Sequence, residues 1–460
     1  MKVIALLALA ILPSSLAGQE IAGDWHGVMD VQGTQLRLTF HIEQTDSGYV
    51  TTMDSPDQGA TGIPVAATKY VAPDLRLELS NISAVYAGTV AGDSIAGTWS
   101  QGMMTFPLVL TRERAAPVGR NRPQEPVQPY PYRDEEVAIR NEQDDLMLAG
   151  TLTLPSNAGP HPAVVLISGS GAQNRDEEVF GHRPFLVLAD HLTRHGIAVL
   201  RYDDRGTGRS TGNFAIATSR DFAADAAAAV AYLTSRPEID RDRIGLIGHS
   251  EGALVAPMVA TRSSDVAFIV LLAGTGIPGR EVSLVQSKTL RPFPVPDEAA
   301  YERFTQTSLD IASSSADLAT RRARLIRHYR SIAPVLESML PGGVEVDAFI
   351  VQQVSEMTTP WHHFFLTYDP ATDLENVTVP VLSLHGSHDV QVPPALHQDG
   401  IRSALERAGN DAFVIRELPG LNHMFQESET GAMSEYATID QTFSPVALNA
   451  ISDWIRDRTR

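Results

Sequence analysis

The pentapeptide GHSEG at residues 248–252 holds the strongest candidate for a nucleophile, the hydroxyl group of Ser250. A short apolar segment, RIGLI (243–247), precedes it, and another, ALVA (253–256), follows it. This order predicts a strand, a tight turn and a helix, which is the setting of a nucleophile elbow. The two glycines suit such a turn because side chains at their positions would collide. We therefore predict that Ser250 is a catalytic nucleophile.

A serine hydroxyl is a weak nucleophile unless a base removes its proton, so a histidine and an orienting acid are also needed. Two predicted strands, residues 379–384 and 413–418, run into loops that carry Asp389 and His423. Since the carboxyl ends of parallel strands meet at one edge of a sheet, we expect both side chains to lie beside Ser250. Asp389 would hold His423 in the tautomer that accepts the serine proton.

Four other residues compete for the acid and histidine roles. Asp369 and Asp373 are weaker acid candidates because no predicted strand leads into either of them. His385 and His388 share the loop of Asp389, and we predict that they are ordinary turn residues.

The negative charge that develops on an attacked carbonyl oxygen needs two backbone N–H donors. The first predicted donor is Glu251, the residue after the nucleophile. The second should follow an earlier strand, and the apolar segment 163–167 leads into Ser-Gly-Ser-Gly at 168–171. We predict that the backbone N–H of Ser170 is this donor, with Gly171 as the alternative.

These loops belong to a predicted α/β domain over residues 134–460. From residue 163 onward, buried strands alternate with helices, which indicates a mostly parallel sheet covered on both faces. The alternation stops between about 275 and 374, where helical, charge-bearing sequence intervenes. An insertion of this size is typical of a helical cap. Its aromatic stripe at 361–368 has helical spacing, which favours a role in the core of the insertion over a pocket wall.

The sequence before residue 134 has a different character. Residues 19–115 alternate apolar and polar positions between frequent turn signals, which predicts a small all-β domain, a meander or barrel. Five prolines within residues 116–133 indicate an extended linker. Residues 1–18 combine a lysine, an apolar run and small residues near a cleavage point, which predicts a secretory signal peptide and a periplasmic or secreted protein. The apolar run is too short to be a membrane anchor.

Composition excludes several kinds of chemistry. The chain has no cysteine, so disulfides, thiolate metal sites and a cysteine nucleophile are excluded. Its net charge of −19 argues against binding to nucleic acid. His191 and His195 could face the same side of a helix, but no HExxH pattern or third ligand accompanies them. We predict neither a metal nor a cofactor.

Five segments together resemble the α/β-hydrolase superfamily, most closely its bacterial esterases and the serine aminopeptidase-like branch. They are LISGSGAQNRDE (166–177), RYDDRGTGRSTG (201–212), GLIGHSEGALVAP (245–257), VPVLSLHGSHDVQVPP (379–394) and LPGLNHMFQ (418–426). The resemblance covers residues 134–460 and implies that Ser250, Asp389 and His423 are catalytic. It also implies that the acids at 203–204 belong to a structural turn. The family often has His-Gly-Gly at the oxyanion loop, whereas this chain has Ser168 in place of the histidine.

We therefore predict a secreted serine carboxylesterase that hydrolyses small esters of short to medium acyl chains through an acyl-enzyme on Ser250. One alternative is an aminopeptidase-like serine peptidase. Another is a non-catalytic ligand-binding protein on a hydrolase scaffold, which the complete triad disfavours. The sequence leaves the oligomeric state and the role of the β-domain open.

Overall fold

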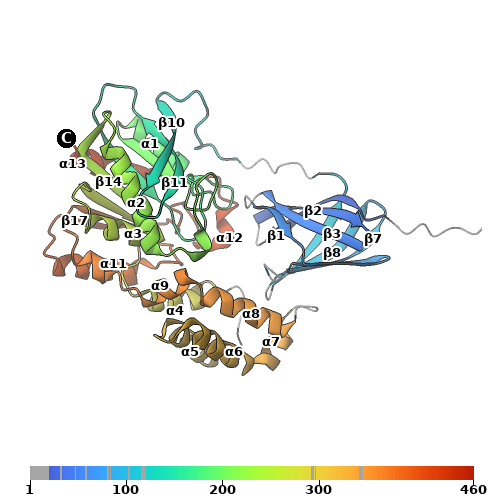
Figure 1. Ribbon diagram of the computed structural model, residues 1–460. Helices are drawn as coiled ribbons and strands as arrows, with labels where there is room; N and C mark the ends of the chain where they lie inside the picture. Colours follow the sequence, from blue (N-terminus) through green and yellow to red (C-terminus); the bar gives the residue numbers. More distant parts are fainter. Residues whose placement is uncertain are drawn as a thin grey trace, which may run out of the picture. The chain divides into compact units, whose positions relative to one another are not determined.

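Figure 1 shows a computed structural model of the chain, which describes residues 20–31, 34–46, 48–56, 60–79, 82, 84–101, 104–114, 121–291, 295, 297–340 and 345–460. The predicted signal peptide at 1–18 and the start of the predicted linker at 116–120 lie outside these residues. The chain splits into two compact units, one built on the N-terminal strands and one on the later α/β pattern.

Within the described ranges, the N-terminal unit is a nine-stranded sheet in the order β4-β3-β2-β1-β9-β8-β7-β6-β5. Its strands are β1 (Gly23–Val31), β2 (Thr34–Thr45), β3 (Gly48–Ser55), β4 (Ala60–Pro64), β5 (Ala67–Val71), β6 (Asp74–Leu79), β7 (Ala84–Ala91), β8 (Ser94–Gln101) and β9 (Met104–Thr111). Most strands pair with a sequence neighbour, and β1 pairs antiparallel with β9. The predicted all-β meander is confirmed, and Figure 1 shows that the sheet curves into a half-barrel.

The alternating apolar positions of these strands fill the inside of the half-barrel. Trp25, Phe40, Tyr86 and Trp99 are all buried, and the Phe40 and Tyr86 rings stack with centroids 5.9 Å apart. The polar atoms that enter this core are satisfied, since the Trp25 indole donates to the Ile21 carbonyl at 2.8 Å. A separate aromatic core therefore stabilises this unit.

The second unit is built on an eight-stranded sheet in the order β10-β11-β13-β12-β14-β15-β16-β17 among the described residues. Its strands are β10 (Arg133–Asn141), β11 (Leu146–Leu154), β12 (His161–Ile167), β13 (Ala198–Tyr202), β14 (Ile239–His249), β15 (Phe268–Leu272), β16 (Val381–Gly386) and β17 (Phe413–Leu418). The strands from β13 to β17 in this order are parallel, and β10 and β11 are antiparallel additions at one edge. The predicted mostly parallel α/β-hydrolase sheet is confirmed.

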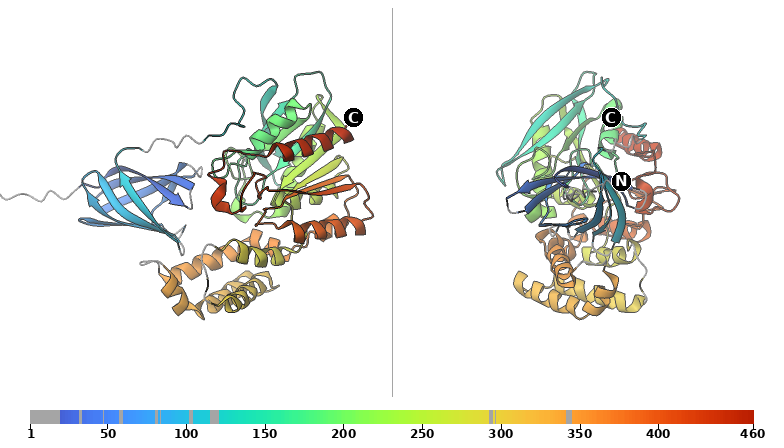
Figure 2. Two further views of the ribbon diagram at one scale, coloured as in Figure 1. Left: turned by 180° about the vertical axis from the view of Figure 1, so that it is seen from behind. Right: turned by 90° about the vertical axis from the view of Figure 1, so that its right-hand side faces the viewer.

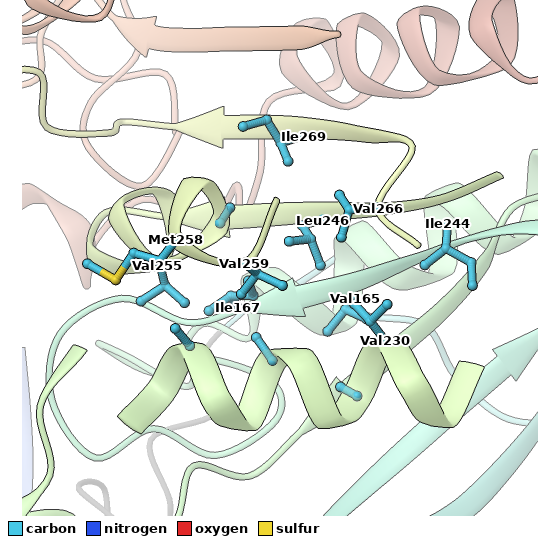
Figure 3. Close-up of a cluster of buried hydrophobic side chains, with 14 of the residues drawn as sticks. Val165, Ile167, Val230, Ile244, Leu246, Val255, Met258, Val259, Val266 and Ile269 are labelled. Atoms are coloured by element: carbon cyan, nitrogen blue, oxygen red, sulfur yellow. The ribbon is translucent and has the colours of Figure 1, made fainter. Parts of the chain in front are cut away.

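Helices cover both faces of this sheet, as Figure 2 shows. Successive residues of β12 point to opposite faces, so Val165 and Ile167 join one core cluster while Val164 and Leu166 join the other. The first cluster also contains side chains of α2 (Ser219–Thr234), α3 (Glu251–Ala260), α10 (Ala371–Leu374) and α11 (Pro394–Arg407), and Figure 3 shows its centre. The second contains side chains of α1 (Pro184–Arg194) and α13 (Pro445–Arg458). Two short helices, a 3₁₀ helix (Phe214–Ile216) and α12 (Met433–Tyr436), lie in connecting loops.

The interruption between β15 and β16 is helical, as predicted for a cap. It contains α4 (Gly279–Thr289), α5 (Glu298–Ser313), α6 (Leu318–Arg330), α7 (Ala333–Met339), α8 (Val346–Met357) and α9 (Pro360–Thr367). The predicted boundary at residue 374 is too late, because Leu374 of α10 is buried in the sheet core. Within the described residues, no helix has the length and apolar character needed to cross a membrane.

The later half of the predicted linker is docked on the α/β unit instead of forming an extended spacer. The Arg122 guanidinium donates to the carbonyls of Gly181 at 3.0 Å and Ile439 at 2.7 Å. The buried Tyr132 donates its hydroxyl to Asp190 at 2.9 Å. The prolines favour an extended backbone, and the arginine and tyrosine side chains of this segment donate to acceptors on the surface of the α/β unit.

Candidate active site

Ser250 occupies the turn between β14 and α3, with φ of 52° and ψ of −113°. A positive φ is strained for a serine, and the turn is held by a hydrogen bond from the Ser250 N–H to the Leu272 carbonyl at 2.8 Å. The two glycines of the pentapeptide are required by close backbone approach. A Cβ on Gly248 would lie 2.0 Å from the Gly252 carbonyl oxygen, and one on Gly252 would lie 2.0 Å from that of Ile167. The geometry is that of a nucleophile elbow.

Asp389 and His423 form a buried pair after β16 and β17. The His423 Nδ1 lies 2.8 Å from one Asp389 carboxylate oxygen, and the other carboxylate oxygen accepts the N–H groups of Gln391 at 2.9 Å and Val392 at 2.8 Å. Since a carboxylate only accepts, Nδ1 carries the hydrogen and Nε2 is left to accept a proton. This is the tautomer a general base for Ser250 requires.

The groups around Asp389 stabilise its negative charge. Burial alone raises the pKa of this carboxyl, but the nearby His423, with which it is hydrogen-bonded, and the Val392 N–H outweigh burial and lower the pKa below its ordinary value. Asp389 therefore remains a carboxylate throughout the neutral range and can stabilise a protonated His423.

The base loop is tied to the nucleophile elbow through the backbone. The ring of His249, the residue before Ser250, hydrogen-bonds the His423 carbonyl through Nε2 at 3.0 Å. The His249 and His423 ring centroids are 4.9 Å apart. The structure thus brings the predicted serine and the predicted acid–base pair to the same sheet edge. Their catalytic roles remain predictions.

The predicted oxyanion loop passes directly beside Ser250. A Cβ on Gly169 would lie 3.3 Å from the Ser250 Cβ, so this glycine allows the loop to approach the nucleophile. Ser170 and Gly171 follow at exposed positions. Glu251 begins α3, where its N–H is one of the unpaired donors of a helix N-terminus. The assignment of Ser170, Gly171 and Glu251 as donors remains a prediction.

The side chain of Glu251 has a second role that sequence reasoning missed. Its buried carboxyl accepts hydrogen bonds from Ser219 Oγ at 2.6 Å and from Trp361 Nε1 at 2.7 Å. Burial raises the pKa of Glu251, and hydrogen bonds from Ser219, Trp361 and Ser170 offset part of that rise. One carboxyl therefore connects the nucleophile elbow, α2, the cap helix α9 and the oxyanion loop.

Asp204 was expected to be part of a structural turn, and it supports the oxyanion loop from behind. Its carboxyl accepts from Ser168 Oγ at 3.0 Å and from the Gln173 N–H at 2.9 Å. Burial raises the pKa of Asp204 to about 8, although both hydrogen bonds lower it. A cavity of about 10 Å³, room for one water molecule, is lined in part by Ser168, Asp204 and Glu251. The sequence did contain a signal for this supporting role, because Asp204 follows β13, whose end lies at the same sheet edge as Ser250.

The competing acids lie elsewhere. Asp373, on α10, accepts from the Tyr368 hydroxyl at 2.6 Å, and Asp369 accepts from the Ala371 N–H at 2.9 Å. Asp389 alone among the three is hydrogen-bonded to His423 in the described structure.

The histidines that competed for the base or metal roles contact other groups. His385 bonds the Gly274 carbonyl at 2.9 Å and His388 bonds that of Ser428 at 2.9 Å. On α1, His191 lies 3.1 Å from Ser452 Oγ and His195 bonds the His191 carbonyl at 2.7 Å. No group of three or more metal-binding side chains forms a candidate metal site in the part of the chain that the structure describes.

Comparison with known proteins identifies the family to which this chain belongs. The model of the X-Pro dipeptidyl-peptidase (S15) family matches residues 144–398, which is more than half of the chain. The chain belongs to this family. The matched region of this S15 family member includes Ser250 and Asp389 and ends before His423.

Two relatives and one solved structure are similar to this S15 family member. It is 26% identical over 305 residues to Esterase EstD of Thermotoga maritima, a match that spans 66% of this chain and 62% of EstD. It is 31% identical over 128 residues to Uncharacterized protein MT2364 of Mycobacterium tuberculosis, covering 28% of this chain and 42% of that protein. The chain thus spans less than two thirds of either relative. The α/β hydrolase GrgF from Penicillium sp. sh18 has a TM-score of 0.45 at 18% identity, over 71% of this chain and 99% of its own. With the S15 family match, the predicted α/β-hydrolase resemblance is confirmed.

Proposed function

We propose that this protein is a serine esterase that hydrolyses carboxylic esters of short to medium acyl chains. The observation that carries the proposal is the hydrogen-bonded pair of Asp389 and His423 at the sheet edge where Ser250 occupies a strained elbow. Similarity to Esterase EstD supports ester substrates.

The reaction follows from the tautomer of His423. Its Nε2 takes the Ser250 proton as Oγ attacks the ester carbonyl, and Asp389 stabilises the imidazolium that forms. Backbone N–H groups of Glu251 and Ser170, or of Gly171 in place of Ser170, would stabilise the oxyanion. The imidazolium then protonates the leaving alcohol, which leaves an acyl group on Ser250. A water molecule activated by the same ring hydrolyses that acyl-enzyme.

A peptidase is the second candidate, because the family is named for X-Pro dipeptidyl-peptidases. Such an enzyme must bind the ammonium group of a peptide N-terminus, for which a carboxylate in the pocket is the natural partner. The buried carboxyls next to Ser250 already have partners within the fold. Glu251 binds Ser219 and Trp361, and Glu177 binds Gly169 and His249. Because these carboxyls are already hydrogen-bonded within the fold, they are poor partners for a substrate ammonium group, which favours an esterase over a peptidase.

The deciding experiment is a substrate panel. The purified protein is assayed with p-nitrophenyl esters from acetyl to octanoyl and with aminoacyl and Xaa-Pro p-nitroanilides, and Ser250→Ala is the control. We expect kcat/KM for the best ester to exceed that for every anilide, and Ser250→Ala to lose ~10⁴-fold or more in kcat. More efficient release of Xaa-Pro dipeptides than of any acyl group would replace the esterase proposal with the peptidase.

We also propose that the protein is exported, on the strength of the signal-like sequence at residues 1–18. Expression of the full sequence in a bacterial host tests this, with the mass of the protein in the periplasm as readout. A mass lacking these residues is expected. An uncleaved protein confined to the cytoplasm would contradict export.

A further inference from the structure

A second histidine–acid pair lies next to the predicted triad. His249, inside the GHSEG pentapeptide, is buried, and its Nδ1 lies 2.8 Å from the Glu177 carboxylate. Its Nε2 lies 3.0 Å from the backbone carbonyl of His423. Glu177 is itself only 3% exposed and has a φ of 51°, an uncommon conformation for this residue type.

The hydrogen bonds of His249 define its charge. A carboxylate and a carbonyl oxygen can only accept, so both ring nitrogens must donate for both contacts to form. With Glu177 ionised, the ring is therefore an imidazolium and Glu177 is its counter-ion. Burial lowers the pKa of His249, but the charge of Glu177, the hydrogen bonds to Glu177 and the His423 carbonyl, and the charge of Asp389 raise it above its ordinary value.

The same pair reaches the oxyanion loop. The Glu177 oxygen that bonds His249 also accepts the N–H of Gly169 at 2.6 Å. Gly169 precedes Ser170, the predicted donor to the oxyanion, and its Cβ position lies 3.3 Å from the Ser250 Cβ. One carboxylate oxygen and one ring therefore join the oxyanion loop, the nucleophile elbow and the base loop.

We propose that Glu177 and His249 are positioning residues, an ion pair that fixes the oxyanion loop and the His423 loop relative to Ser250. The inference rests on the proposed hydrolase function. Loss of the second ring proton removes one of the two contacts of His249, so the loops separate and turnover falls. This predicts an alkaline limb in the pH profile of kcat/KM.

The other groups that face His249 come from the loops after β16 and β17. Asp389 contributes a second negative charge from the loop after β16. The loop after β17 contributes the His423 ring and the Phe425 ring, whose centroids are 4.9 and 6.4 Å from that of His249. The charges of Glu177 and Asp389 therefore both favour the protonated ring.

Kinetics of three variants test the pair. Glu177→Gln keeps the size of the side chain but removes the counter-ion, so the alkaline limb should move to lower pH. His249→Gln carries both of its N–H groups on one nitrogen, which cannot replace Nδ1 and Nε2 together. We expect kcat to fall by about 10²-fold with a smaller change in KM, because displaced loops weaken transition-state contacts. The control is His191→Gln, a change to a histidine of helix α1. It should change neither the alkaline limb of the pH profile nor kcat.

A spectroscopic readout keeps the test independent of turnover. The ¹⁵N spectrum of the histidine rings, recorded on the Ser250→Ala protein, should show a doubly protonated ring at pH 7 that disappears in a Ser250→Ala, His249→Gln double variant. A neutral His249 ring in that spectrum, or an alkaline limb unmoved by Glu177→Gln, would overturn the proposal. Failure of the wild-type protein to hydrolyse any ester or anilide would instead count against the proposed function, since the ring signal does not depend on activity.

Discussion

At the scale of single residues, the pKa values of the buried carboxyls around the site shift in opposite directions. Asp389 has a lowered pKa because His423 and backbone N–H groups stabilise its charge. Burial dominates at Asp204 and Glu251, whose pKa values are raised. A protonated carboxyl can donate as well as accept, so Asp204, with a pKa of about 8, can support the oxyanion loop at neutral pH without adding charge.

The role of Asp389 gives a direct prediction. Asp389→Asn should reduce kcat/KM for the best ester by about 10⁴-fold, because the amide favours the wrong tautomer of His423. Asp373→Asn is the matched control, since Asp373, on α10, accepts a hydrogen bond from the Tyr368 hydroxyl. It should leave kcat/KM within about twofold of wild type. A larger loss in Asp373→Asn than in Asp389→Asn would show that the acid has been misassigned.

Asp204 gives a prediction about stability and pH. Its pKa is about 8 in the folded protein, whereas an ordinary aspartate has a value of 3.8. Between these values the folded state holds a proton that the unfolded state has released. Stability therefore falls as pH rises through this window, by at most about 1.4 kcal/mol per pH unit. Asp204→Asn removes this titration, so its unfolding temperature should rise relative to wild type from pH 4 to pH 8.

The control for this measurement is Asp411→Asn, at an exposed position before β17, which should follow the wild-type curve. Thermal unfolding of the three proteins across the pH range provides the comparison. A constant difference between Asp204→Asn and wild type would show that Asp204 is ionised throughout.

At the scale of elements, the cap helix α9 contacts the sheet edge through Trp361. Trp361 of α9 stacks on Phe365 with centroids 5.4 Å apart and donates to the Glu251 carboxyl. Phe364 and Phe365 pack against the sheet core, whereas the aromatic stripe was predicted to lie in the core of the insertion. Trp361 departs from that pattern because its indole reaches the residue after the nucleophile.

This contact predicts a dependence of substrate preference on the cap. Trp361→Ala should change the acyl chain length with the highest kcat/KM, because it removes a large apolar surface and the donor to Glu251. Trp361→Phe keeps an aromatic ring and loses the donor, whose absence costs about 1–3 kcal/mol at a buried acceptor. It should lower kcat/KM with less change in preference. If Trp361→Ala has the same acyl chain-length preference as wild type, Trp361 has only a structural role.

Periodicity and strand ends were sufficient to predict most elements and the grouping of Ser250, Asp389 and His423. The helical sequence predicted between about 275 and 374 contains α4 to α9, and the strand predicted at 243–247 is the end of β14. The beginning of β14 was missed because Asp240 to Arg243 are polar, although Ile239 pairs with His161. The role of Glu177 could not be predicted from the sequence. Its partner His249 is distant in the sequence, its partner Gly169 carries no side chain that would mark it, and the three residues meet only in the fold.

At the scale of the whole molecule, the segment at 121–132 is structurally part of the α/β unit. Its contacts end on loops near α12, where the Gln124 amide donates to the Phe443 carbonyl at 2.6 Å and Arg122 donates to the Ala437 carbonyl at 3.2 Å. Glu125 pairs with Arg183 at the start of α1. The proline-rich composition of this segment thus favours docking in an extended form, with little conformational entropy to lose.

The last prediction concerns where the α/β unit begins. All the contacts described around Ser250 lie within residues 121–460, so this fragment should fold and react with a fluorophosphonate at Ser250 at a rate close to that of the full chain. A fragment of residues 134–460 should also react, but it loses the buried Tyr132 and the Arg122 hydrogen bonds. At about 1 kcal/mol for each hydrogen bond and about 2 kcal/mol for the ring, its unfolding temperature should be lower by roughly 5 °C or more. Equal unfolding temperatures would mean that the docked segment contributes no stability. If fragment 121–460 folds but fails to react while the full chain is labelled, the N-terminal β-unit must supply part of the site.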